Sequence, residues 1–323
     1  MSPGTGAAHR SSAPAGAPAR SPLPETFGPG KVILLGEHAV VYGHPALAVP
    51  LTLGVTARAV ASDRCTLTGL TDLNEAQRGM LDAAFDAVAE ATGRPPLRIT
   101  VSSTLPVSMG LGSSAALAVA VSRLLLSAAG SRPSPAKVLG LALRMEETFH
   151  GTPSGVDHTV SAHGAPVLYR RASPGRQARV RQVRVGAPAT LVLALAGPRR
   201  GTQQTVAALR QRAKRWPKRY GRLFEEMGRL ALEGTRALEA GDLETLGDAM
   251  NVNHGLLAAA GVSSPALDVA VDALRRAGAL GAKLTGAGGD GGAVVALFRS
   301  PPPVATLEQA GLTVLTSELE PTQ

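Results

Sequence analysis

The sequence is poor in aromatic residues, in cysteine and in long apolar runs. Aromatic residues make up only 3% of the 323 residues, so the cores must be built from alanine, valine and leucine. The single cysteine, Cys65, excludes an intramolecular disulfide and fits a reducing compartment. No run of 18 apolar residues is present, which argues against a membrane-spanning helix. These absences favour a globular, cytoplasmic protein.

The chain is long enough for more than one core. Because 323 residues exceed the usual size of one core, we expect two domains after a disordered tail. Residues 1–24 are rich in Ser, Pro, Ala and Gly and lack the apolar segment of a secretion signal, so they are predicted to form that tail. A new unit begins near an apolar strand at 190–196, which divides the remainder into domains at 25–188 and 189–323.

Periodicity and turn residues predict the order of helices and strands. Strands are expected at 31–35, 46–61, 97–103, 167–171, 180–185, 190–196, 281–285, 293–298 and 312–316. Helices are expected at 73–92, 114–129, 135–150, 203–216, 222–240, 243–260 and 264–277. The strands do not alternate steadily with helices, which favours an α+β fold over a doubly wound sheet.

The net charge is positive, with 33 Lys and Arg against 24 Asp and Glu. Six of the basic residues fall between Arg210 and Arg219, and only Trp216 and Tyr220 supply aromatic rings nearby. A nucleic-acid site needs exposed aromatic side chains or a known binding module beside such a patch. The basic run is therefore interpreted as a solvated helix, and neither a nucleic acid nor a membrane is expected as a partner.

The most informative segment is P-V-S-M-G-L-G-S-S-A-A, residues 106–116. Its glycines let backbone N–H groups approach an anion, and the alanine-rich helix that follows adds partial positive charge at its start. Ser113 and Ser114 add hydroxyls that suit phosphate oxygens and a hard cation such as Mg²⁺. No Gly-Lys-Ser/Thr follows, so the segment predicts a phosphate-binding loop of a kind other than a Walker loop. The alternative is a serine-capped turn before a buried helix.

A second segment, F-G-P-G-K-V-I-L-L-G-E-H over residues 27–38, places Lys31 where a strand leaves a Pro-Gly turn. Glu37 and His38 follow the next glycine. Taken alone, Lys31 fits a solvated strand end and His38 an ordinary turn residue, because turn residues seldom carry chemistry. This segment gains a functional interpretation only together with the other motifs.

A third segment, K-L-T-G-A-G-G-D-G-G-A over residues 283–293, holds five glycines between two predicted strands. A plain hairpin turn needs only one or two. Since each additional glycine costs backbone entropy, the pattern indicates that another group approaches this backbone closely.

Two carboxylates stand on either side of a turn within residues 145–158. Glu146 lies near the end of a predicted helix, and Asp157 follows 11 residues later, after Gly-Thr-Pro-Ser-Gly. A glutamate can bind Mg²⁺, and an aspartate can accept the proton of a substrate hydroxyl. Phosphoryl transfer needs both a Mg²⁺ ligand and an acceptor for the hydroxyl proton. Two carboxylates at this spacing are weak evidence by themselves.

In combination, these motifs resemble the GHMP kinase superfamily of galactokinases, homoserine kinases, mevalonate kinases and phosphomevalonate kinases. P-G-K-V-I-L-L-G-E-H-A-V-V-Y-G (29–43) and H-G-T-P-S-G-V-D (150–157) are most similar to the mevalonate kinases. The similarity continues through P-R-R-G-T (198–202) and D-A-M-N-V-N-H-G-L-L (248–257), so it covers nearly everything after residue 25. It implies a two-domain α+β GHMP architecture with the active site in the inter-domain cleft.

The resemblance also implies the roles of individual residues. Binding of the ATP triphosphate is expected of residues in two loops: Gly110, Leu111, Gly112, Ser113 and Ser114, with Gly286, Gly288 and Gly289. Ser114 and Glu146 are expected to bind Mg²⁺. Asp157 is expected to act as the catalytic residue facing the substrate hydroxyl, with Lys31 stabilising the transferring phosphoryl group. The mevalonate site is expected to be lined by Glu37, His38, Arg200 and Thr202, of which Arg200 suits a carboxylate.

The implied activity is ATP- and Mg²⁺-dependent phosphorylation of the 5-hydroxyl of mevalonate, and the family also implies a homodimer. The sequence departs from the family pattern in three places: at Ser108-Met109 in the phosphate loop, and at Asp290 and at Gly292 in the third segment. One alternative is a GHMP kinase for phosphomevalonate or a sugar. Another is a non-catalytic regulator or nucleic-acid binder on the same fold.

Overall fold

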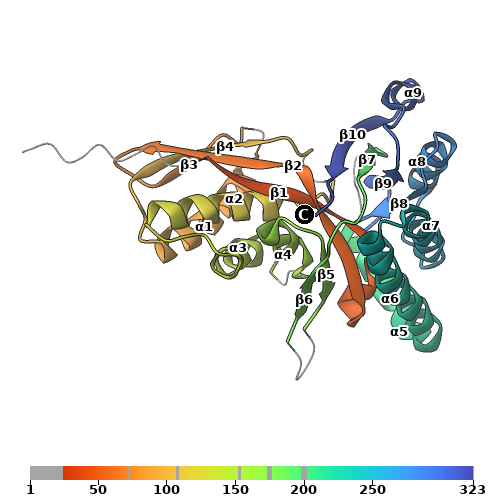
Figure 1. Cartoon of the computed structure of the whole chain (residues 1–323). Helices are drawn as coiled ribbons and strands as arrows, with labels where there is room; N and C mark the ends of the chain where they lie inside the picture. The colour runs from red at the N-terminus through yellow and green to blue at the C-terminus, as the bar shows by residue number, and fades with distance from the viewer. Residues whose placement is uncertain are drawn as a thin grey trace, which may run out of the picture.

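The structure is a computed structural model that describes residues 25–71, 73–106, 109–151, 154–172, 177–197 and 202–322, with only the backbone of His150 and Thr202. The predicted tail at 1–24 lies outside the described residues. Two β-sheets organise the described chain, and Figure 1 shows them side by side with helices on the outside. The first sheet is built from residues up to Gln182, and the second begins at Ala189.

The first sheet has the strand order β3-β4-β2-β5-β6, with β1 paired to β2. Its strands are β1 (Thr26–Leu35), β2 (Pro45–Ala61), β3 (Thr66–Thr68), β4 (Leu97–Ser103), β5 (Val167–Arg170) and β6 (Arg179–Gln182). All of these pairings are antiparallel except that of β3 with β4. The helices gathered on one side of this sheet in Figure 1 are α1 (Glu75–Ala91), α2 (Ser113–Ala128), α3 (Pro135–His150) and α4 (Val156–His163).

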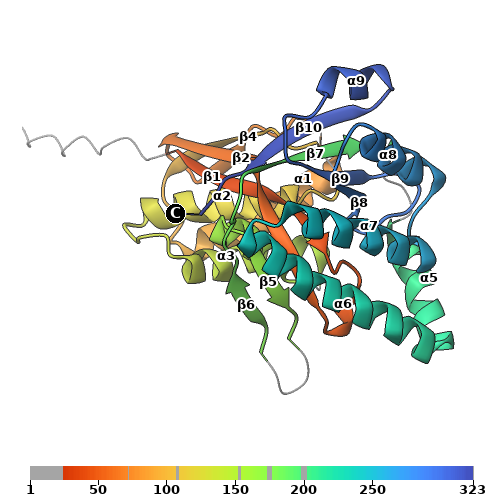
Figure 2. The same ribbon diagram turned by 45° about the vertical axis from the view of Figure 1, so that its right-hand side comes forward.

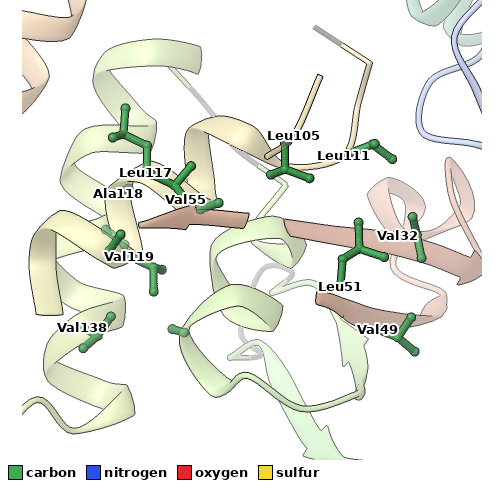
Figure 3. Close-up of a cluster of buried hydrophobic side chains, with 14 of the residues drawn as sticks. Val32, Val49, Leu51, Val55, Leu105, Leu111, Leu117, Ala118, Val119 and Val138 are labelled. Atoms are coloured by element: carbon green, nitrogen blue, oxygen red, sulfur yellow. The ribbon is translucent and has the colours of Figure 1, made fainter. Parts of the chain in front are cut away.

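Helix α2 forms the centre of this half of the molecule, and most of its residues are buried. Its alanines allow the sheet to come very close, since a Cβ at Gly28 of β1 would lie 2.0 Å from the carbonyl oxygen of Ala116. Figure 3 shows the resulting core, in which Leu117 and Val119 of α2 lie near Val55 of β2. The lack of aromatic residues thus goes together with a tightly packed aliphatic core.

The second sheet has the strand order β10-β7-β9-β8 and is antiparallel throughout. Its strands are β7 (Ala189–Leu195), β8 (Gly281–Thr285), β9 (Ala293–Phe298) and β10 (Thr313–Leu319). The accompanying helices are α5 (Thr202–Arg215), α6 (Pro217–Ala240), α7 (Leu243–Ala259), α8 (Pro265–Arg276) and α9 (Val304–Gln309). Figure 2 shows α6 and α7 running alongside this part of the chain.

Three strands of the second sheet, β7, β8 and β9, are buried on both faces, which explains the continuous apolar runs of β7 and β9, whereas the edge strand β10 is largely exposed. Alternate residues such as Val192 and Val294 face a core shared with α5 to α8. Their neighbours Leu193 and Val295 join the core that holds the first sheet and α2. Because one core spans both sheets, the two halves of the chain are packed together rather than loosely linked.

The predicted strands and long helices are confirmed, mostly within a few residues, and the fold is of the predicted α+β kind. Four short elements were not predicted: the 3₁₀ helix η1 (Ala39–Tyr42), β3, α4 and α9. These segments are too short to show a periodic pattern, and α4 has only eight residues between Gly155 and Gly164. Helix α6 also begins at Pro217, five residues before the predicted start.

Several residues of the basic run make structural contacts within the protein. The Arg212 guanidinium donates to the carbonyl oxygens of Ala260 and Gly261 at 2.9 and 3.0 Å, just past the end of α7. Arg215 and Arg219 lie over the Trp216 ring, at 4.9 and 5.6 Å from its centre. Part of the run therefore caps a helix and packs on an indole. Within the described ranges, no helix is long and apolar enough to cross a membrane.

Candidate active site

Lys31 and Asp157 meet although 126 residues separate them in the sequence. The Lys31 ammonium lies 3.2 Å from an Asp157 carboxylate oxygen and donates a hydrogen bond to the carbonyl oxygen of Gly110 at 3.1 Å. The Lys31 side chain is 4% exposed and that of Asp157 is 33% exposed, so solvent reaches the pair at the aspartate. A carboxylate, an ammonium and the glycine loop thus share one site.

The glycine loop is held against β1 by both backbone and side chain. The Lys31 N–H donates to the carbonyl oxygen of Leu111 at 2.8 Å. A Cβ at Gly112 would lie 2.9 Å from Cγ of Lys31, and Gly112 adopts a φ of 76°. Glycine at this position therefore leaves room for the lysine side chain on its way to Asp157.

Helix α2 begins at Ser113, directly after this loop. Its N-cap residue is Gly112, and no side chain caps the first turn. The first N–H groups of such a helix have no partner within the helix, and the macrodipole makes this end favourable for an anion. The start of this helix is therefore suited to an anion such as a phosphate group.

Asp157 is positioned by the short helix α4, where it stands in the first turn. The preceding Gly155 has a φ of 90°, and a Cβ there would lie 2.1 Å from the Tyr169 hydroxyl oxygen. That hydroxyl in turn donates to the carbonyl oxygen of Ser154 at 3.2 Å. The Ser-Gly-Val-Asp sequence thus makes a tight turn against β5 that aims the carboxylate at Lys31.

Glu146 and Ser114 lie on the two packed helices α3 and α2. Glu146 is 2% exposed, in the last turns of α3, and Ser114 is the second residue of α2. A buried carboxylate needs compensating partners, because burial alone disfavours its charged form. The oxygen atoms of the Glu146 carboxylate and the Ser114 hydroxyl are of the type that a hard divalent cation prefers.

The third glycine segment connects β8 to β9 and faces the phosphate loop. All five of its glycines have positive φ values, between 66° and 122°. A Cβ at Gly286 would have Gly110 as its nearest neighbour, with the oxygen at 3.9 Å. Gly288 and Gly289 lie against Val262, whose carbonyl oxygen accepts from the Gly289 N–H at 3.0 Å. Asp290 is exposed.

Glu37 has a buried environment just past the end of β1. It is 2% exposed, and one carboxylate oxygen pairs with the ammonium of Lys283, which is itself fully buried in β8. The other oxygen accepts a hydrogen bond from the Asn253 side chain of α7 at 2.9 Å. Burial lowers the pKa of Lys283, and the Glu37 carboxylate opposes this shift. Both Glu37 oxygens are thus engaged by protein groups.

His38 follows Glu37 and has a strained backbone, with a φ of 61°. Such a conformation is uncommon for a residue other than glycine and clusters at functional sites. The next residues form η1, whose Tyr42 ring stacks on Phe224 of α6 with 4.1 Å between ring centres. The turn is therefore held between β1 and the helices of the second sheet.

Comparison with known proteins places these features in one family. Residues 79–165 match the family model for the GHMP kinases N terminal domain, and residues 235–311 match that for the GHMP kinases C terminal domain. The mevalonate kinase of Pyrococcus horikoshii is 35% identical over 296 residues, covering 81% of this chain and 85% of the relative. That of Methanothermobacter thermautotrophicus is also 35% identical, covering 83% and 88%.

This protein belongs to the GHMP kinase family. Among solved structures, the L. major mevalonate kinase in complex with R-mevalonate has a TM-score of 0.82 and 26% identity, over 94% of this chain and 99% of that one. The family predicted from the motifs is therefore confirmed, and with it the two-domain α+β GHMP kinase fold.

The structure of this GHMP kinase brings Lys31, Asp157, the phosphate loop and Gly286 together, whereas the side chains of two predicted site residues are not described. Arg200 lies outside the described residues, as does the Thr152-Pro153 part of the turn before Asp157. Thr202 begins α5, and only its backbone is described. Their assignment to the substrate site stays a prediction.

Sequence reasoning missed Lys283, Asn253 and His254 of this GHMP kinase. His254 is buried, and its Nε2 lies 3.2 Å from an Asp268 carboxylate oxygen. Burial lowers the pKa of His254. One signal was available: a lysine in the middle of a buried strand requires an acidic partner. Nothing in the spacing pointed to Glu37, 246 residues away, as that partner.

Proposed function

We propose that this protein transfers the γ-phosphoryl group of ATP to the 5-hydroxyl of mevalonate. The observation that carries the proposal is the Lys31–Asp157 pair, which lies against the phosphate loop at the start of α2. The similarity to mevalonate kinases, over more than 80% of the chain, selects mevalonate among the alcohols that GHMP kinases phosphorylate.

The reaction needs the hydroxyl proton to be removed while negative charge on the phosphoryl group is stabilised. An Asp157 carboxylate oxygen accepts the proton from the 5-hydroxyl as the hydroxyl oxygen attacks the γ-phosphorus, and the bond from that phosphorus to the bridging oxygen breaks so that ADP leaves. The Lys31 ammonium, 3.2 Å away, stabilises the charge on the transferring group. The N–H groups at the start of α2 bind the phosphates, and the third glycine segment approaches the same region from the other sheet.

We propose Mg²⁺ as the cation, held by Ser114 and Glu146. The described residues contain no cluster of three or more His, Cys, Asp or Glu side chains that could hold a metal ion by themselves. One hydroxyl and one carboxylate fit Mg²⁺, which usually takes one or two carboxylates and completes its coordination with phosphates and water. When bound, the ion neutralises phosphate charge.

An apolar cavity beside the phosphate loop is suited to the adenine ring. It has a volume of about 220 Å³ and is lined by Ser113 and Ser114 of α2 together with Leu73, Met80 and Phe149. A flat, mostly apolar base fits such a lining. On the substrate side, His38, Thr202 and Arg200 are proposed to contact mevalonate, with Arg200 binding its carboxylate.

The environment of Glu37 refines its predicted role in the substrate site. Because its two oxygens are engaged by Lys283 and Asn253, we propose that Glu37 positions the strained His38 turn rather than binding mevalonate directly. A cytoplasmic location and a homodimer remain proposals from composition and family.

The test is a panel of alcohols in a coupled assay of ADP release with Mg²⁺ present. We expect the kcat/KM for mevalonate to exceed those for phosphomevalonate and galactose by at least about tenfold. Turnover of either competitor in preference to mevalonate would reassign the substrate within the family. ATP turnover on none of them, together with a gel shift at physiological salt, would favour the non-catalytic alternative.

A further inference from the structure

We propose that a cavity between the β5–β6 hairpin and helix α6 binds a small molecule that carries a phosphate group and an apolar body. The cavity has a volume of about 730 Å³ and shares no lining residue with the proposed active site. Figure 1 shows the hairpin projecting away from the rest of the first sheet, with α6 beside it.

Four arginine side chains from two elements line this cavity. Arg170, Arg179 and Arg181 belong to the hairpin, and Arg229 belongs to α6. Among the lining residues that the structure describes, Glu225 is the only one with a carboxylate, and it pairs with Arg229 at 3.2 Å. The lining therefore carries an excess of positive charge.

The four arginines differ in their acidic partners. Arg181 pairs with Glu239. Among the residues that the structure describes, neither Arg170 nor Arg179 forms an ion pair, and Arg170 donates only through Nε, to the carbonyl oxygen of Gly43 at 2.6 Å. The terminal nitrogens of two guanidinium groups are left as donors toward the cavity.

The register of the hairpin sets these two arginines directly opposite each other. Arg170 pairs with Arg179 across the antiparallel strands, and Leu168 pairs with Arg181 on the same face. Like charges in directly opposed positions destabilise a hairpin, because their Cβ atoms are only about 5 Å apart. A bound dianion removes this repulsion and gives both guanidinium groups charge-assisted hydrogen bonds.

The apolar lining residues favour a ligand larger than a free phosphate ion. Leu232 of α6 is 43% exposed, and Leu168 and Pro45 complete an apolar surface. Burying this surface favours a ligand with an apolar body attached to its phosphate group. The ligand class is thus an organic phosphate or diphosphate small enough for the cavity.

The test is calorimetric titration of phenyl phosphate into the full chain, with the phosphate loop saturated by a non-hydrolysable ATP analogue. We expect binding at millimolar concentration or tighter, and tighter binding than that of inorganic phosphate. Arg170→Gln and Arg179→Gln should each weaken binding about tenfold or more, as expected for losing a charged hydrogen bond. The matched control Arg276→Gln removes an exposed arginine paired with Asp272 on α8 and should leave binding unchanged.

Thermal melting separates lost binding from misfolding. Arg179→Glu relieves the cross-strand repulsion, so this variant should melt at the same or a higher temperature while binding no phenyl phosphate. Unchanged affinity in both glutamine variants, or no binding by the unaltered protein, would overturn the proposal. So would light scattering that shows a dimer lost in Arg179→Glu, because the arginines would then face a second copy of the chain.

Discussion

Lys283 and Glu37 form an ion pair that is almost completely shielded from solvent, between β8 of the second sheet and the turn after β1. The same ammonium donates to the carbonyl oxygens of Ile33 and Leu284. This pair therefore fixes the position of one sheet relative to the other beside the proposed site. The strained His38 directly follows Glu37, so the ion pair also holds the backbone next to it.

Removing one member of this pair should be costly. Lys283→Met leaves the Glu37 charge buried, so we expect the free energy of unfolding to fall by about 3–5 kcal/mol in denaturant titrations. The double variant Lys283→Met/Glu37→Gln should recover part of that loss, since no buried charge remains. Breaking the exposed Arg276–Asp272 pair should cost less than about 1 kcal/mol. Equal losses at the two pairs would contradict this interpretation.

The Asp157 carboxylate is the proposed proton acceptor. Asp157→Asn should keep the fold and ATP binding but lower kcat by about 10² or more, because an amide cannot take the proton. Steady-state kinetics and equilibrium nucleotide binding measured on the same preparation test this. Near-normal turnover would remove Asp157 from the mechanism.

Stability should depend on pH through the buried histidines. Burial lowers the pKa of His158, while Asp157 and Glu147 oppose that shift. In the unfolded chain the imidazole binds a proton near its ordinary pKa of about 6.5. Below that pH the unfolded state holds more protons than the folded state, so stability falls as pH falls from about 7 to 5.5. His158→Gln should flatten this slope in melting experiments, and an unchanged slope would exclude a contribution of His158.

Asp290 departs from the family pattern, but its side chain is exposed. A carboxylate aimed at the triphosphate would repel it, whereas one in solvent is screened. Asp290→Gly should therefore leave the KM for ATP within about threefold. Isothermal titration with ATP provides an independent check, and tenfold tighter binding by the variant would show that the carboxylate faces the phosphates.

Much of the fold was predictable because its elements are long and strongly patterned. The strand that became β4 was predicted with its exact bounds, and the phosphate loop was readable from its glycines and serines. The contact of Lys31 with Asp157 was not readable from spacing, because tertiary packing decides it, and only the family resemblance suggested it. The Glu37–Lys283 pair was missed for the same reason. The three-residue β3 exists through pairing with β4 and leaves no local signal.

The most direct test of the proposed function follows the labelled γ-phosphate of ATP. Incubation with mevalonate and Mg²⁺, followed by nuclear magnetic resonance of the products, identifies the oxygen that carries the new phosphate ester. We predict a monoester on the 5-oxygen with one ADP formed per ester, and no ester above background with Asp157→Asn. Release of the label only as inorganic phosphate, with mevalonate unchanged, would contradict the account.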